Sequence, residues 1–167
     1  MSWLQLADSC SKFDRNLLII DFHMSKLEIL MDLVKENQTI LLVGVPGFGQ
    51  EEMMKEVAEA AGLKYLSAYA CDPNAWHCFL ARYDTDRYPN WAIEAINNPD
   101  NEYLLFLDEV QECMDSEYSK LLQFTEQRLI GDKTLSNVKV CAAYNEYEWK
   151  ARKELSEFDF FQSIIAW

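Results

Sequence analysis

The sequence contains no apolar run long enough to cross a membrane. Its longest apolar runs have about seven residues, whereas a spanning helix needs roughly 20. The first ten residues also lack the basic stretch followed by a long apolar segment that marks a secretion signal. These two absences lead us to expect a cytoplasmic protein.

Paired cysteine motifs are also absent. The five cysteines include no CxxC pair, and an odd set of this kind is typical of reduced thiols. Cys71, His77 and Cys78 lie close together in the sequence, but their spacing does not match that of the usual zinc ligands. We expect them to bind no metal, because free cysteines are most often simply buried.

Basic side chains are scarce relative to acidic ones. The chain has 15 lysines and arginines against 28 aspartates and glutamates, a formal net charge of −13. A surface this negative repels phosphate, which argues against direct nucleic-acid binding and against docking on anionic membranes. The acidic excess lies in residues 1–115. It serves either ordinary solubility or the occupation of a basic surface on another protein.

Glycine and proline are few, with 5 and 4 residues, and no repeat or Gly/Ser/Pro-rich linker divides the chain. Half of the 167 residues are hydrophobic, enough for the core of one domain. We therefore expect a single domain over residues 1–167, in which 1–20 form an N-terminal extension.

Short apolar runs alternate with segments of helical periodicity. We expect strands over 39–45, 63–70, 103–107, 138–144 and 158–166. We expect helices over 22–36, 50–61, 91–98, 116–129 and 146–155. Wholly apolar strands separated by helices predict an α/β three-layer sandwich with a mostly parallel five-stranded sheet.

Three of the five glycines fall within six residues, between the first expected buried strand and the helix after it. A turn of the form G-x-x-x-x-G-K-[S/T] at such a junction binds phosphate through inward-pointing backbone N–H groups and the helix N-terminus. The candidate phosphate-loop residues are Gly44, Pro46, Gly47, Phe48, Gly49, Gln50 and Glu51.

Two positions of this turn depart from the phosphate-binding pattern. Gln50 stands at the lysine position, and Glu51 stands where a hydroxyl would hold magnesium. The lost charged hydrogen bonds are worth roughly 1.5–3 kcal/mol each, and a carboxylate 4 Å from a phosphate adds repulsion of about 4 kcal/mol. Together they weaken triphosphate binding on the order of a thousandfold. We therefore expect a vestigial turn, although Glu51 as a direct magnesium ligand is the open alternative.

A second candidate site ends the apolar run 104–107. Asp108 and Glu109 follow this run directly, about 60 residues after the glycine turn. In P-loop enzymes, an aspartate at this point helps to hold magnesium and a following glutamate activates water. Because the carboxyl ends of parallel strands share one edge of the sheet, we expect both carboxylates to lie near the glycine turn.

The order of these features resembles that of the AAA+ ATPases, and within them the MoxR-like group. The resemblance covers roughly residues 24–166 and rests on segments 39–49 as Walker A, 91–99, 103–110 as Walker B, 121–128, 136–145 and 155–160. It implies that Asp108 and Glu109 are the Walker B carboxylates and that Asn145 occupies the sensor 1 position. If the protein is active, these three residues are the catalytic set, with Asp108 and Glu51 holding magnesium.

The same resemblance exposes further departures. Glu157 stands where the family usually carries an arginine finger, a reversal of charge. Lys150, Arg152 and Lys153 lie shortly upstream, and one of them is the candidate substitute. The helical lid that follows the core in the family is expected to be absent.

These departures lead to three hypotheses. The first is a catalytically degenerate AAA+-like domain that acts through protein contacts, as a regulatory or decoy subunit. It needs no cofactor, or binds ATP or ADP with magnesium only weakly, and its partner is an AAA+ ring or a basic protein surface. The second is an ATPase whose site is completed by a partner, and the third is an acidic inhibitor. The first hypothesis predicts exposed aromatic side chains, and the candidates are Trp3, Trp149, Phe161 and Trp167.

Overall fold

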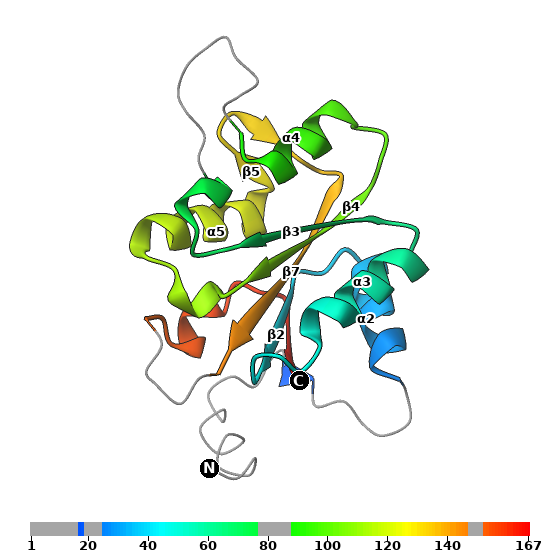
Figure 1. Ribbon diagram of the computed structural model, residues 1–167, viewed down its shortest axis with the longest axis vertical. Coiled ribbons are helices and arrows are strands. Elements are labelled where there is room, and N and C mark those ends of the chain that lie inside the picture. Colours follow the sequence, from blue (N-terminus) through cyan, green and yellow to red (C-terminus); the bar gives the residue numbers. More distant parts are fainter. Residues whose placement is uncertain (1–16, 19–24, 77–87, 147–151) are drawn as a thin grey trace.

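The chain forms a parallel sheet with helices on both faces (Figure 1). The computed structural model describes residues 17–18, 25–76, 88–146 and 152–167. Five strands make up the body of the sheet: β2 (Ile40–Gly44), β3 (Lys64–Tyr69), β4 (Tyr103–Asp108), β7 (Val138–Asn145) and β8 (Ser163–Ala166). They run parallel in the order β8-β2-β7-β4-β3, which confirms the expected α/β fold class. A two-residue strand, β1 (Leu17–Leu18), extends the sheet beyond β8 and was not predicted.

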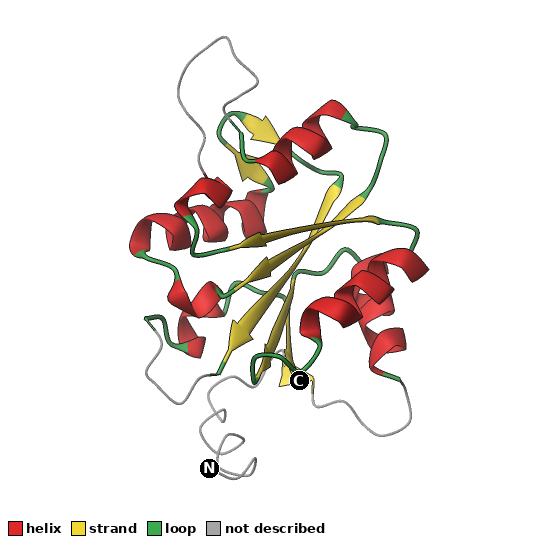
Figure 2. Cartoon of the chain, viewed as in Figure 1, coloured by secondary structure: helices red, strands yellow, loops and turns green. Residues whose placement is uncertain are grey.

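Successive residues of β2 face opposite layers, as the two-residue period of a strand requires. Ile40 and Leu42 pack with α2 (Lys26–Lys35) and α3 (Gln50–Ala60) in one layer. Leu41 and Val43 belong to the other layer, with α4 (Asn90–Asn97) and α5 (Asp115–Gln127). Figure 2 shows the helices on the two sides of the sheet. This explains why the strand is apolar throughout: it is buried on both faces.

Local signals set several element ends. The side chain of Ser25 accepts from the backbone N–H of Glu28, and the carboxylate of Glu28 accepts from the backbone N–H of Ser25, so the two form a reciprocal capping box at the start of α2. Gly62, with φ of 70°, follows α3 and confirms the predicted stop. Arg128 ends α5 in the left-handed conformation, and its guanidinium donates to the carbonyl oxygens of Phe124 and Val138.

A hairpin between α5 and β7 was missed. Its strands β5 (Leu129–Ile130) and β6 (Lys133–Thr134) pair antiparallel. The predicted helix 116–129 therefore runs two residues too far, because Arg128 leaves the helical conformation and Leu129 pairs with Thr134. Two-residue strands are too short for a periodic pattern to identify.

The C-terminal segment corrects two further predictions. A 3₁₀ turn, η4 (Leu155–Phe158), stands where the predicted helix 146–155 meets the predicted strand 158–166. The strand begins only at Ser163, and residues 152–154 are not helical, while 147–151 lie outside the described residues. Phe158 packs edge-to-face on Tyr118 and Tyr144, with ring centroids 5.7 Å away in both cases. The aromatic run therefore fills the core from a turn, although its apolar character imitates a strand.

Among the residues that the structure describes, no helix has both the length and the apolar character that a membrane crossing requires.

Candidate functional site

The glycine turn links the carboxyl end of β2 to the first residue of α3. Gly47 and Gly49 have φ of 81° and 85°, a region that side chains with a Cβ disfavour. A Cβ on Gly44 would lie 3.0 Å from Cβ of Trp167 and 3.3 Å from Nε2 of Gln50. The three glycines are thus required by the path of the turn itself, whether or not a phosphate binds.

The side chain of Gln50 folds back onto this turn. It is only 5% exposed, and its Nε2 donates to the carbonyl oxygen of Val45 over 3.4 Å. A neutral amide therefore lies inside the turn, at the position where a phosphate-binding loop carries a lysine.

The carboxylate of Glu51 is engaged with its own helix. One of its oxygens lies 2.8 Å from Nζ of Lys55, and the hydroxyl of Tyr65 donates to the same oxygen over 3.5 Å. Burial, together with the charge of Glu51, raises the pKa of Tyr65. Lys55 thus offsets part of the negative charge that Glu51 brings to the turn.

The structure brings Asp108 and Asn145 together at the ends of β4 and β7. Asn145 Nδ2 donates to Oδ1 of Asp108 over 2.9 Å, and the backbone N–H of Glu109 donates to the same oxygen over 2.9 Å. Glu109 itself adopts the left-handed conformation, with φ of 59°. Three of the predicted site residues therefore form one connected group at the carboxyl edge of the sheet.

Gln111 completes this group, although no sequence pattern predicts it. It is fully buried, its Oε1 accepts from the backbone N–H of Asn145 over 3.0 Å, and its Nε2 donates to the carboxylate of Glu109. A single glutamine near a strand end has no distinguishing pattern, so only the fold reveals its position.

Burial raises the pKa of Asp108 above its ordinary value of 3.8, against the opposing hydrogen bonds from Asn145 and the Glu109 N–H. The charges of Glu109 and Glu51 act in the same direction as burial. The folded chain therefore holds this proton more tightly than the unfolded chain does. That contribution to stability is complete below pH 3.8 and is lost as the pH rises through the raised pKa.

Substitution of Asp108 with asparagine is expected to stabilise the chain at neutral pH, because it removes a partly buried charge and keeps an Oδ1 acceptor. The gain over wild type should shrink toward zero as the pH falls from about 7 to 4, since wild-type Asp108 becomes protonated. Urea unfolding midpoints of the two proteins across this range measure the effect. A difference that stays constant with pH would contradict it.

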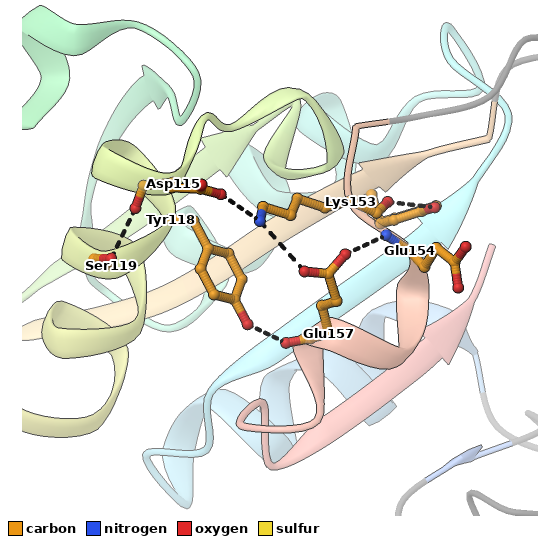
Figure 3. A network of polar contacts seen from close by, with 7 residues as sticks. Asp115, Tyr118, Ser119, Lys153, Glu154 and Glu157 are labelled. Atoms are coloured by element: carbon orange, nitrogen blue, oxygen red, sulfur yellow. Dashed lines mark hydrogen bonds and ion pairs between the residues drawn. The ribbon is translucent and has the colours of Figure 1, made fainter.

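The position of the expected arginine finger is part of a polar network, shown in Figure 3. Nζ of Lys153 lies 2.8 Å from Oδ1 of Asp115 and 3.3 Å from Oε2 of Glu157. Oε1 of Glu157 accepts from the backbone N–H of Glu154 over 2.9 Å. The side chain of Lys153 is only 15% exposed, and both of its ion pairs lie within its own chain. Arg152 is exposed, and Lys150 lies outside the described residues.

Glu157→Arg is expected to lower the thermal unfolding midpoint, because it places a second cation beside Lys153 and removes the acceptor of the Glu154 N–H. Glu157→Gln should cost less, since its amide oxygen can still accept that hydrogen bond. Glu126→Arg, at an exposed position of α5, controls for the general effect of added positive charge. Equal midpoints for Glu157→Arg and this control would show that the network does not stabilise the fold.

The expected set of exposed aromatic residues is wrong at Phe161, which is 1% exposed and belongs to the core. Trp167 is partly buried: its indole N–H donates to the carbonyl oxygen of Phe48 over 2.9 Å, and Nζ of Lys26 lies 4.2 Å from its ring centroid. Trp3 and Trp149 lie outside the described residues.

The carboxylates nearest the turn already have partners within the chain. Oδ1 of Asp108 already accepts two hydrogen bonds, and Glu51 is paired with Lys55. Within the described part of the chain, no group of three or more histidine, cysteine, aspartate or glutamate side chains is arranged to hold a metal ion. Cys71, Cys113 and Cys141 are free thiols there, whereas His77 and Cys78 lie outside it.

A parallel sheet of this strand order, with a glycine turn after β2 and acidic residues after β4, defines an α/β core of the P-loop NTPase kind. No protein-family model and no curated protein that was compared with the sequence matches it.

Solved structures do match, and one of them is described as a crystal structure of "a putative ATPase from Cytophaga hutchinsonii". The TM-score is 0.59 at 20% sequence identity, over 84% of this chain and 44% of the other. At this identity the likeness establishes the fold alone. The chain spans less than half the length of that ATPase.

Proposed function

We propose that this chain is a catalytically degenerate, AAA+-like domain that acts mainly through contacts with other proteins. The observation that carries the proposal is the state of the glycine turn. Gln50 donates back to the turn, and Glu51 adds a carboxylate where a hydroxyl is needed. Both replacements fall on the groups that would touch nucleotide charge, whereas the glycines that shape the turn are kept.

The finger position supports the same proposal. Glu157 and Lys153 satisfy each other within the chain, so this region offers a neighbouring subunit no positive charge from Lys153. A regulatory or decoy subunit needs the shape of the ATPase core but not its chemistry. The MoxR-like subgroup is part of this proposal, because it rests on the order of the sequence motifs alone.

We further propose that the domain requires no cofactor and binds ATP or ADP with magnesium only weakly. Its partner in this proposal is a protein, either an AAA+ ring or a basic protein surface. The net charge of −13 favours basic partners over nucleic acid and anionic membrane.

Titration of the wild-type chain with Mg-ATP, followed by native mass measurement, tests the proposal. We expect no stoichiometric complex at micromolar nucleotide. A one-to-one complex at that concentration would show that the turn still binds nucleotide, and the degenerate reading would fail.

A second candidate, an ATPase whose site is completed by a partner, is favoured by the contact between Asp108 and Asn145. The carboxylate, Glu109 beside it and the amide remain where hydrolysis would need them. Steady-state ATP turnover in the presence of a partner, abolished by Glu109→Gln, would support this candidate. Wild-type turnover no greater than that of Glu109→Gln would count against it.

A further inference from the structure

Strongly exposed large apolar side chains gather at one edge of the sheet. Among the described residues they are Val45, Phe48, Tyr69 and Met114, which are 43%, 70%, 63% and 56% exposed. Val45 and Phe48 follow β2, Tyr69 is the last residue of β3, and Met114 lies between β4 and α5. All four therefore belong to the carboxyl ends of parallel strands, the edge that holds the candidate site. Chance exposure would scatter such residues over the surface.

The topology sets the size of this apolar edge. β2 and β3 are separated in the sheet by β7 and β4, so their ends lie three strand spacings apart, about 14 Å. Tyr69 pairs in register with Asp108, which places one end of the apolar edge beside the Asp108 and Asn145 group. A helix of about ten residues covers this length.

The backbone of Phe48 is fixed while its ring remains exposed. The indole N–H of Trp167 donates to the carbonyl oxygen of Phe48, and the backbone N–H of Trp167 donates to the carbonyl oxygen of Val43 over 2.7 Å. An apolar ring on a fixed backbone loses less entropy when it becomes buried against a partner.

The charges of the same edge select the chemistry of the partner. Its carboxylates, on residues that end or follow β2, β3 and β4, include Glu51, Asp72, Asp108, Glu109, Glu112 and Asp115. Of the nearby cations in the described part of the chain, Lys55 is paired with Glu51 and Lys153 with Asp115, while Lys26 lies over the ring of Trp167 and Arg152 is exposed. The edge is therefore acidic around its apolar residues. A second copy of this chain, also at −13, would be repelled.

We propose that the carboxyl edge of the sheet is a docking surface for a basic, amphipathic segment of a partner protein. Apolar side chains of that segment contact Phe48, Tyr69 and Met114, and its lysines or arginines face the carboxylates between them. This inference rests on the proposed function and names the surface and the partner chemistry that it requires. The segment would lie where a P-loop enzyme holds its nucleotide.

Three synthetic helical peptides of about 14 residues, long enough to span the edge, test this assignment. The first combines lysine with leucine at positions i, i+3, i+4 and i+7. The second replaces each lysine with glutamate, and the third replaces each leucine with serine. Fluorescence anisotropy of the labelled peptides against the full chain is expected to show binding of the first peptide about tenfold tighter than of either other peptide.

Variants of the chain locate the contact. Phe48→Ser and Tyr69→Ser are each expected to weaken the lysine–leucine peptide about tenfold, because they remove exposed anchors. Circular dichroism checks that both variants remain folded. Glu146 also lies at the carboxyl edge, because its backbone N–H donates to the carbonyl oxygen of Gly44 over 2.8 Å. Asp72→Asn with Glu146→Gln removes two charges from this edge, and Asp100→Asn with Glu102→Gln removes two charges from the opposite edge. Only the first pair should weaken binding.

Three results would each overturn the docking surface. They are equal affinity for the lysine–leucine and lysine–serine peptides, no effect of Phe48→Ser and Tyr69→Ser, or equal losses from the two charge pairs. Mg-ATP binding separates this failure from that of the proposed function. If the wild type binds nucleotide tightly, the degenerate-domain proposal is refuted, whatever the peptides show. If the wild type binds neither nucleotide nor peptide, only the docking surface is refuted.

Discussion

Replacement of Gln50 with lysine and Glu51 with threonine is expected to tighten Mg-ATP binding on the order of a thousandfold. The glycines already give the turn its phosphate-loop path, with Gly47 and Gly49 at positive φ, so no backbone change is needed. Lysine would supply charged hydrogen bonds worth roughly 1.5–3 kcal/mol each. Threonine would remove a carboxylate and supply the missing hydroxyl.

The two substitutions should contribute unequally. Lys55 lies 2.8 Å from Glu51 and already offsets part of its charge, so Glu51→Thr alone should improve binding less than Gln50→Lys alone. Gln50→Lys also releases the amide that now bonds to Val45. Calorimetric titration of the wild type, the two single variants and the double variant measures these differences. If the wild type binds as tightly as the double variant, the turn is not degenerate.

Phe124→Ala is expected to destabilise the chain by about 3–5 kcal/mol, the usual cost of removing a fully buried aromatic ring. Phe124 is 0% exposed, and its ring centroid lies 5.0 Å from that of Trp91 and 6.2 Å from that of Trp76. This aromatic cluster holds the segment after β3, since the indole N–H of Trp76 donates to the carbonyl of Ala70 over 2.7 Å. Its loss should loosen that part of the carboxyl edge as well.

Thermal and urea unfolding of Phe124→Ala measure this loss, and a fall of about 10 °C in the midpoint is expected for a domain of this size. Phe48→Ala is the matched control, because the same substitution at a ring that is 70% exposed should change stability by no more than about 0.5 kcal/mol. Similar losses at the two positions would contradict the burial that separates them.

Most of the fold could be predicted from local patterns. The strand now seen as β2 is a wholly apolar run beside a glycine turn, and β4 is an apolar run that ends in two carboxylates. Both patterns arise because the two faces of each strand are buried, so the buried residues of the strand are apolar and the run is visible in the sequence. Local patterns did not predict the C-terminal region correctly. The aromatic run at 158–161 is apolar because its side chains pack in the core from a turn, not because it forms a strand.

Candidate site residues could be predicted individually but not as a group. Asp108 and Glu109 are predicted from their place at the end of an apolar run, and Asn145 is predicted from the resemblance to a sensor 1 strand. The structure joins all three. Gln111 could not be identified, since its role depends on a hydrogen bond to Asn145, 34 residues away. The ion pair between Lys153 and Asp115 likewise joins residues 38 positions apart, so no local pattern predicts it.

The sequence by itself determined the α/β class, the turn that only glycines can form, and the two replacements that remove phosphate-binding groups. These properties are local, because they depend on backbone torsion angles, short apolar runs and the identity of single side chains. Only the tertiary structure decided that Phe48, Tyr69 and Met114 share the acidic edge, that Phe161 is buried and that Lys153 is already paired. Those outcomes depend on which distant segments the sheet places side by side. Contacts between distant segments produce no periodic pattern in the sequence.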